Sequence, residues 1–259
     1  MTIIVGIKCK DGVVLGSDSQ QEFGRGVAVK RLNTGKIYKL DERFAVAGAG
    51  TLAHIEKAID SIKVALDDTK TRKGGVDLCE DDCVNAIERA MTVTHKTYNV
   101  ERAAFLDDPH ERSFFNPILI CGCLEHSGKQ DTACLFIIHP EGVVETISDY
   151  ATAGSGAAYA ELLLKNYYKA ELSIGETVPL VIHAINEVID IDPNCGGAIR
   201  IATVNSETGI KMLTTKDIED IQKSTEPLIG LVENKIVPLI LRGEIDAERI
   251  ERAIEEGKK

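Results

Sequence analysis

The first eighteen residues carry the clearest indication of chemistry, because they place a threonine and an aspartate at the two ends of a predicted hairpin. Residues 3–9 alternate in the period-2 pattern of a β-strand. Asp11-Gly12 follows, a strong signal for a tight turn in which glycine adopts a positive φ angle. The returning strand therefore brings Asp18 to the end of the sheet where Thr2 lies. A threonine with a free α-amine is a recognised nucleophile, because that amine can act as its base.

An N-terminal threonine nucleophile has four requirements, and the sequence offers a candidate for each. A small residue after Met1 favours removal of the methionine, which would expose the amine of Thr2. Lys36, which opens the next predicted strand, is the candidate for a positive group that lowers the pKa of that amine, and Asp18 is the carboxylate that would hold it. Taken alone, Lys36 is more simply a surface lysine. Gly50 lies at a strand-to-helix turn, where its N–H can stabilise an oxyanion. We therefore interpret Thr2 as a nucleophile rather than as a strand residue behind a retained Met1.

The predicted elements come in blocks, which indicates an α+β fold. Two sheets with a helix pair on each outer side fit this order, and residues 2–213 show no internal boundary. Residues 214–259 form a predicted helical C-terminal extension. In chain order we expect strands at 36–40 and 44–47, helices at 52–66 and 83–98, strands at 118–124, 133–138 and 143–147, a glycine-rich corner at 152–156, helices at 157–169 and 176–191, and a hairpin at 198–213.

The composition restricts the partners and the location of the protein. A net charge of −11 argues against nucleic acid or an anionic membrane as the main partner, because both require a basic surface. No apolar run is long enough for a membrane span, and the N-terminus lacks the pattern of a signal peptide. The seven cysteines are odd in number and scattered, which favours a reducing, cytoplasmic location.

The cysteines also raise two alternative chemistries. Cys121 and Cys123 share one face of a strand, and Cys79 and Cys83 share one face of a helix, but no further pair completes a zinc site. We therefore interpret both pairs as core residues and predict no metal. Cys195 is an alternative nucleophile. No sequence motif identifies a histidine as its base, so a neutral core thiol is the simpler interpretation.

Six short motifs occur in a specific order and spacing across residues 2–213. They are Thr2-Ile3-Ile4-Val5-Gly6-Ile7, Lys10-Asp11-Gly12-Val13-Val14-Leu15-Gly16-Ser17-Asp18, Lys36-Ile37-Tyr38, Ala47-Gly48-Ala49-Gly50-Thr51, Gly154-Ser155-Gly156 and Asp192-Pro193-Asn194-Cys195-Gly196-Gly197-Ala198. Together they resemble the catalytic β-type subunits of the proteasome, members of the N-terminal nucleophile (Ntn) hydrolases. The resemblance implies a four-layer αββα sandwich, to which residues 214–259 add a C-terminal helical extension.

The resemblance also implies roles for individual residues, and it implies no cofactor. Gly48 would lie at the base of the specificity pocket, with Gln21 and Leu52 as further substrate-binding residues. The implied catalytic set is Thr2 as nucleophile and base, Asp18 and Lys36 as the charge pair that tunes its amine, Ser155, Asp192 and Cys195 as groups that orient the amine, and Gly50 as an oxyanion donor.

Three substitutions and two long segments depart from the family pattern. Cys195 stands where the family has serine, and a thiol is the weaker hydrogen-bond donor. Gln20 replaces a usual arginine and His54 a usual aspartate. Residues 101–117 and the tail after Thr214 are longer than the family core. These departures favour a proteasome-like homologue with its own assembly over a standard subunit.

The sequence thus predicts a threonine-type endopeptidase that cleaves peptide bonds through an acyl-enzyme on Thr2. The resemblance implies a peptide or unfolded-protein substrate, a homo- or hetero-oligomeric ring of proteasome-type subunits, and an ATP-dependent unfoldase as a further partner. Two alternatives stay open. The same acyl-enzyme can be captured by an amine, which would make the protein an amide transferase or amidohydrolase. The chain can also be a non-catalytic structural ring subunit that retains Met1.

Overall fold

The computed structural model describes residues 2–20, 35–102, 115–127, 130–231 and 255. The chain divides into two compact units, residues 1–213 and 214–259. The predicted substrate-binding residue Gln21 lies outside the described residues. Within the described residues, no helix is both long enough and apolar enough to cross a membrane.

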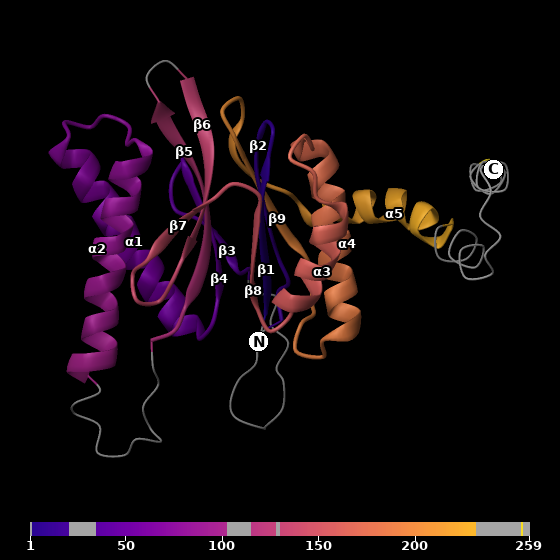
Figure 1. The fold of residues 1–259 in the computed structure, drawn as a ribbon, viewed down its shortest axis with the longest axis horizontal. Helices are drawn as coiled ribbons and strands as arrows, with labels where there is room; N and C mark the ends of the chain where they lie inside the picture. Colours follow the sequence, from indigo (N-terminus) through magenta and orange to yellow (C-terminus); the bar gives the residue numbers. More distant parts are fainter. Residues whose placement is uncertain (1, 21–34, 103–114, 128–129, 232–254, 256–259) are drawn as a thin grey trace. The chain divides into compact units, whose positions relative to one another are not determined.

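The first unit has four layers (Figure 1). Two five-stranded sheets face each other, with one helix pair over each outer side. This arrangement confirms the predicted αββα sandwich. The strands are β1 (Ile3–Cys9), β2 (Gly12–Ser17), β3 (Ile37–Lys39), β4 (Phe44–Ala49), β5 (Ile118–Ser127), β6 (Gln130–Ile138), β7 (Val144–Ile147), β8 (Tyr150–Gly154), β9 (Arg200–Asn205) and β10 (Gly209–Met212). The helices are α1 (Leu52–Arg72), α2 (Glu80–Lys96), α3 (Ala157–Tyr167) and α4 (Ile174–Ile191), with a π-helical segment at Thr97–Arg102 after α2.

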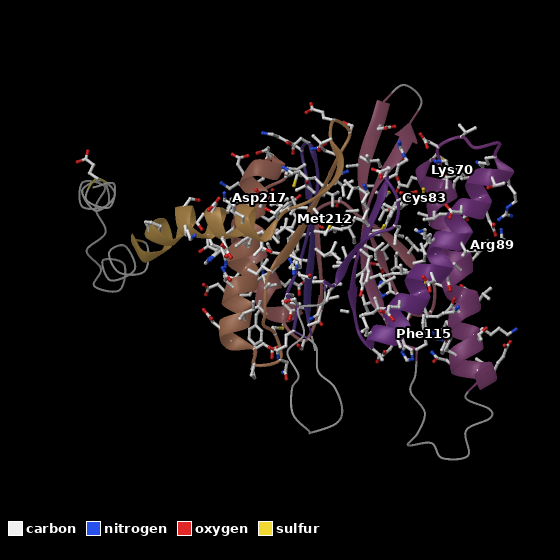
Figure 2. All side chains as sticks on the ribbon, turned by 180° about the vertical axis from the view of Figure 1, so that it is seen from behind. Lys70, Cys83, Arg89, Phe115, Met212 and Asp217 are labelled. Atoms are coloured by element: carbon white, nitrogen blue, oxygen red, sulfur yellow. The ribbon has the colours of Figure 1, made fainter. Side chains whose placement is uncertain are left out.

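Apolar side chains pack between the layers and hold them together (Figure 2). The strand orders are β10-β9-β2-β1-β8 in one sheet and β3-β4-β5-β6-β7 in the other. Between the sheets lie small and branched side chains such as Ile4, Leu15 and Ala47. Between the second sheet and helices α1 and α2 lie larger ones, including Phe136 and Met91. Burial of such side chains contributes about 1.5–3 kcal/mol each.

The predicted N-terminal hairpin is confirmed, but its glycine acts for a different reason. Strands β1 and β2 pair antiparallel, with Ile4 opposite Ser17 and Cys9 opposite Gly12. The turn is therefore Lys10-Asp11, and Gly12 does not have the positive φ angle expected for it. A Cβ at Gly12 would instead collide with the backbone oxygen of Val204. Close packing against β9, rather than turn conformation, requires glycine at this position.

Two further elements differ from the sequence prediction. Strand β8 replaces the corner that we expected to begin at residue 152, and it pairs with β1. Its buried residues, Ala151 and Ala153, are alanines, which give a weak strand signal. Helix α4 begins at Ile174, earlier than predicted, because Ser173 and Glu176 form a capping box. Pro179 consequently lies beyond the first turn, rather than within it.

The second unit contains one described helix of several turns, α5 (Thr215–Leu231). It begins where Thr214 and Asp217 exchange hydrogen bonds: the Thr214 backbone N–H and hydroxyl donate to the Asp217 carboxylate, and the Asp217 N–H donates to the threonine oxygen. This reciprocal cap satisfies donors at a helix start that would otherwise lack partners.

Candidate active site

The carboxylate of Asp18, at the end of β2, is the centre of the site. It is fully buried and accepts four hydrogen bonds. Lys36 Nζ donates to Oδ1 at 2.6 Å, and the N–H of Ile3, next to Thr2, donates to the same oxygen at 3.1 Å. The N–H groups of Gln20 and Gly196 donate to Oδ2 at 3.2 and 3.1 Å. Asp18 therefore joins the nucleophile strand to a buried cation.

Thr2 is held from the other side by the corner after β8. Its backbone nitrogen, which in this chain is the peptide N–H of the Met1–Thr2 bond, donates to Ser155 Oγ at 3.3 Å. The N–H of Gly156 donates to the Thr2 carbonyl at 3.3 Å. Gly154 has φ +104°, and a Cβ there would collide with that carbonyl oxygen. The glycines on both sides of Ser155 thus let the corner wrap closely around Thr2.

A third group reaches Ser155 from the end of α4. Ser155 Oγ lies 3.8 Å from Cys195 Sγ, and this thiol donates to Asp192 Oδ2 at 3.5 Å. Burial raises the pKa of Asp192, but hydrogen bonds from Asn194, Ser155 and Cys195 outweigh it and lower the pKa overall. Burial, with a smaller contribution from Asp18, raises the pKa of Cys195 to about 12. Cys195 is therefore a neutral thiol, which disfavours it as the nucleophile.

The predicted oxyanion donor Gly50 and the substrate residue Leu52 follow β4, and the predicted pocket residue Gly48 lies within it. The backbone carbonyl of Lys36 accepts from the N–H of Gly48 at 2.9 Å, so β4 passes beside the charge pair. Gly50 is exposed with φ +129°, and a Cβ there would approach the Asn116 carbonyl oxygen to 3.1 Å. Leu52 is half-buried at the start of α1. A Cβ on Gly48 would meet Ile55 Cγ2 at 2.5 Å, so core side chains fill the space beside it.

Sequence reasoning missed the residue that holds Asp192. Asn194 donates to Asp192 Oδ1 from its backbone N–H at 3.0 Å and from Nδ2 at 2.7 Å. The available signal was an asparagine two residues after an aspartate, a spacing typical of such local bonds. His54, one of the departures from the family pattern, packs against Tyr98 and Phe115. Burial lowers the pKa of His54, so it is a neutral core residue.

The fold defines the class of protein, an α+β sandwich of the Ntn type. A family model described as "Proteasome subunit" matches residues 2–204. The chain belongs to the proteasome subunit family.

Archaeal proteins are among its relatives. The chain is 29% identical to a proteasome subunit beta of Methanothermobacter thermautotrophicus over 231 residues, 88% of this chain and 95% of that protein. It is 28% identical to proteasome subunit beta 2 of Pyrococcus furiosus over 86% of this chain and 95% of the relative. It is 29% identical to a proteasome subunit beta of Nanoarchaeum equitans over 82% of this chain and 97% of the relative.

Proposed function

We propose that the protein is a threonine-type endopeptidase whose nucleophile is Thr2 after removal of Met1. One observation carries this proposal. The Asp18 carboxylate binds both Lys36 Nζ and the N–H that follows Thr2, so the nucleophile strand and a buried cation are coupled through one group. Membership of the proteasome subunit family supports the same reaction class.

The proposed reaction has two steps. The Thr2 amine accepts the proton of Thr2 Oγ, and Oγ attacks the substrate carbonyl while the Gly50 N–H stabilises the oxyanion. The tetrahedral intermediate releases the new amine product, which takes the proton, and leaves an ester on Thr2. Water then hydrolyses this ester by the reverse proton path. The cation of Lys36 favours the unprotonated amine, as a nearby positive charge lowers the pKa of an amine.

The remaining site residues have supporting roles in this proposal. Ser155 orients the Thr2 nitrogen, and Asp192 and Cys195 hold Ser155. Leu52 and Gln21 are the proposed substrate-binding residues, and Gly48 would lie at the base of the specificity pocket, whose depth the Ile55 side chain limits. We further propose a peptide or unfolded-protein substrate, a cytoplasmic location, and assembly into a homo- or hetero-oligomeric ring that an ATP-dependent unfoldase serves. The family of the chain supports the ring.

The experiment combines intact mass with peptide turnover. We expect the purified protein to lack the mass of one methionine and to cleave fluorogenic peptides. Thr2→Ala should abolish cleavage and keep the unfolding midpoint, whereas Thr2→Ser should keep part of the activity because it retains a hydroxyl. Thr71→Ala, an exposed threonine on α1, serves as the matched control. Unchanged turnover in Thr2→Ala would overturn the assignment.

The same experiment separates the two alternatives. A retained Met1 together with no turnover indicates a structural ring subunit. Product masses measured with and without an added amine separate hydrolysis from amide transfer, because only transfer yields an amide between the acyl group and the added amine.

A further inference from the structure

A second group of reactive side chains lies at the other end of the sandwich from Thr2. Strand β4 connects the two ends, running from Phe44, opposite Cys123, to Ala49 just before Gly50. At this second end, the carboxylates of Glu80 and Glu125 and the thiol of Cys134 place one ligand atom each within 4.8 Å of one another. We call these three residues the thiol–carboxylate cluster.

Strand register brings the cluster together. Cys123 on β5 lies directly opposite Cys134 on β6. Glu125 follows Cys123 by two residues and so points to the same face of β5. This face packs against α2, whose first residue is Glu80. Cys134 Sγ lies 3.9 Å from Glu80 Oε2, which closes the group.

The cluster has an accessible rim and a buried base. Cys123 is fully buried and Cys134 is 6% exposed. Glu80 and Glu125 are only half-buried. The Thr146 hydroxyl donates to Glu80 Oε1 at 2.7 Å, and the Glu80 N–H donates to Glu125 Oε2 at 2.9 Å. These bonds orient the two half-buried carboxylates at the rim of the cluster.

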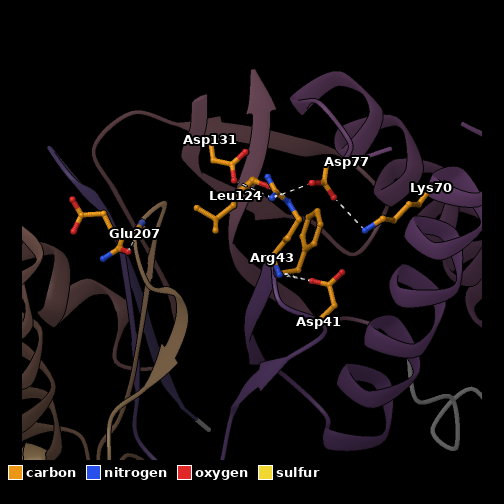
Figure 3. Close-up of polar contacts among 9 residues, drawn as sticks. Asp41, Arg43, Lys70, Asp77, Leu124, Asp131 and Glu207 are labelled. Carbon is orange, nitrogen blue, oxygen red and sulfur yellow. Dashed lines mark hydrogen bonds and ion pairs between the residues drawn. The ribbon is translucent and has the colours of Figure 1, made fainter. Parts of the chain in front are cut away.

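Among the side chains that the structure describes, no lysine, arginine or histidine forms an ion pair with Glu80 or Glu125. Arg43, whose Nε donates to the carbonyl of Leu124, instead directs Nη1 to Asp77 and Asp131 (Figure 3). Adjacent carboxylates repel each other unless a proton or a cation lies between them.

We propose that the thiol–carboxylate cluster binds one divalent cation of borderline softness, with Zn²⁺ as the best fit. Cys134 supplies one sulfur ligand, and Glu80 and Glu125 supply two oxygen ligands. Three protein ligands with a fourth position open to water suit the tetrahedral coordination of zinc, whereas Mg²⁺ and Ca²⁺ prefer oxygen ligands alone. Binding replaces the Cys134 thiol proton, which passes to solvent, by a sulfur–metal bond. The bound ion would tie the start of α2 to β5 and β6.

A purely structural reading of the same residues makes a different prediction. Cys79, the N-cap of α2, forms no side-chain cap hydrogen bond, and Glu125 supplies an acceptor to the first N–H of the helix. If capping is the whole role of Glu125, the protein binds no metal ion at this position.

The test uses the reduced full-length protein, stripped with a chelator and then titrated with Co²⁺. Cobalt bound by thiolates absorbs strongly in the near ultraviolet, and tetrahedral cobalt gives intense visible bands. We expect one equivalent of Co²⁺ with both signatures, displaced by Zn²⁺ and not by Mg²⁺. Zinc should also raise the unfolding midpoint of the wild type, because a ligand that binds only the folded state stabilises it.

Two ligand variants and two cysteine controls locate the ion. Cys134→Ser and Glu125→Gln should each weaken zinc binding by about 100-fold or more, since even groups that only orient ligands contribute about 10- to 100-fold. Cys79→Ser, an exposed thiol near the same helix, and Cys195→Ser, at the Thr2 end, should bind as the wild type does. If Cys134→Ser fails to fold, the half-exposed Glu125→Gln decides the question.

Three results would overturn the proposal. They are no stoichiometric binding by the wild type, undiminished binding by the ligand variants, and loss of binding in Cys195→Ser. None of these results depends on peptidase activity.

Discussion

Acidic side chains have opposite surroundings at the two ends of the β-sandwich. At the Thr2 end, Asp18 is completely enclosed and receives four hydrogen bonds, one of them from the buried cation Lys36. At the other end, Glu80 and Glu125 lie close together beside two thiols, and none of the described side chains forms an ion pair with them. At the Thr2 end the acid is paired with a cation of the chain, whereas at the other end the described side chains offer no cation to the two carboxylates.

This difference indicates what fixes the side-chain geometry at each end of the sandwich. A buried ion pair is costly to break, because removal of one partner leaves an uncompensated charge. The Thr2 end can therefore keep its geometry without help from a ligand, which suits a site that must be organised before substrate arrives. The thiol–carboxylate cluster would gain most of its rigidity from a bound cation.

From the contrast between the two ends, we expect substitution of Asp18 to have the largest effect on stability. Asp18→Ala should reduce the free energy of unfolding by about 3–5 kcal/mol, because Lys36 then stays buried without its carboxylate. Urea denaturation monitored by circular dichroism measures this loss. The double variant Asp18→Leu with Lys36→Met should recover much of it, as neither charge is then left unpaired. A loss below about 1 kcal/mol in the single variant would show that the pair is solvated like a surface pair.

A smaller effect is expected at Cys195, where a thiol makes long contacts to Ser155 and Asp192. In Cys195→Ser, a hydroxyl forms stronger bonds to both neighbours and orients the Thr2 nitrogen better. A net gain of about 0.5–1.5 kcal/mol corresponds to about a 2- to 10-fold rise in kcat/KM. Steady-state peptide cleavage measures it, with Cys79→Ser as the control. Complete loss of activity would instead identify Cys195 as the reacting nucleophile.

The pH dependence of stability tests how Asn194 and Asp192 contribute to the Thr2 end. The folded-state pKa of Asp192 is lowered, so its contribution to stability is present above the unfolded-state pKa and is lost as pH falls through the folded-state pKa. Asn194→Ala removes the 2.7 Å bond from Nδ2 and should raise that pKa. Acid unfolding should then begin at higher pH, with a loss of about 1 kcal/mol at neutral pH. An unchanged acid transition would contradict this role of Asn194.

The smallest effect is expected at Asp77, at the same end as the thiol–carboxylate cluster. Asp77 lies 3.4 Å from Arg43 Nη1 and 3.2 Å from Lys70 Nζ, and its side chain is 38% exposed. Asp77→Ala should therefore cost less than about 1 kcal/mol in urea denaturation. Arg43 keeps Asp131 and the Leu124 carbonyl as partners. A loss as large as that of Asp18→Ala would remove the contrast between the two ends.

Local pattern was sufficient to predict much of the architecture. The hairpin of residues 3–17, the helices around Ile59 and Ile185, and the αββα layering follow from apolar periodicity and from the block order of strands and helices. The motif order also predicted the family. At Gly12 the residue was identified correctly but its reason was not, because packing against Val204, which is distant in the chain, decides it. The roles assigned to Thr2 and its neighbours stay predictions that the experiments above test.

Other features depend on residues that are distant in the chain, and only the tertiary structure decided them. Strand β8 is short and rich in alanine, yet its pairing with β1 places Ser155 against Thr2 across 153 residues of sequence. Glu80 and Glu125 meet only because α2 begins above the end of β5. Hydrophobic periodicity indicates which face of its own strand or helix a residue occupies. It does not indicate which distant element packs against that face. The sequence by itself thus determined the elements and the order of the motifs, while strand register and helix placement decided which side chains share a site.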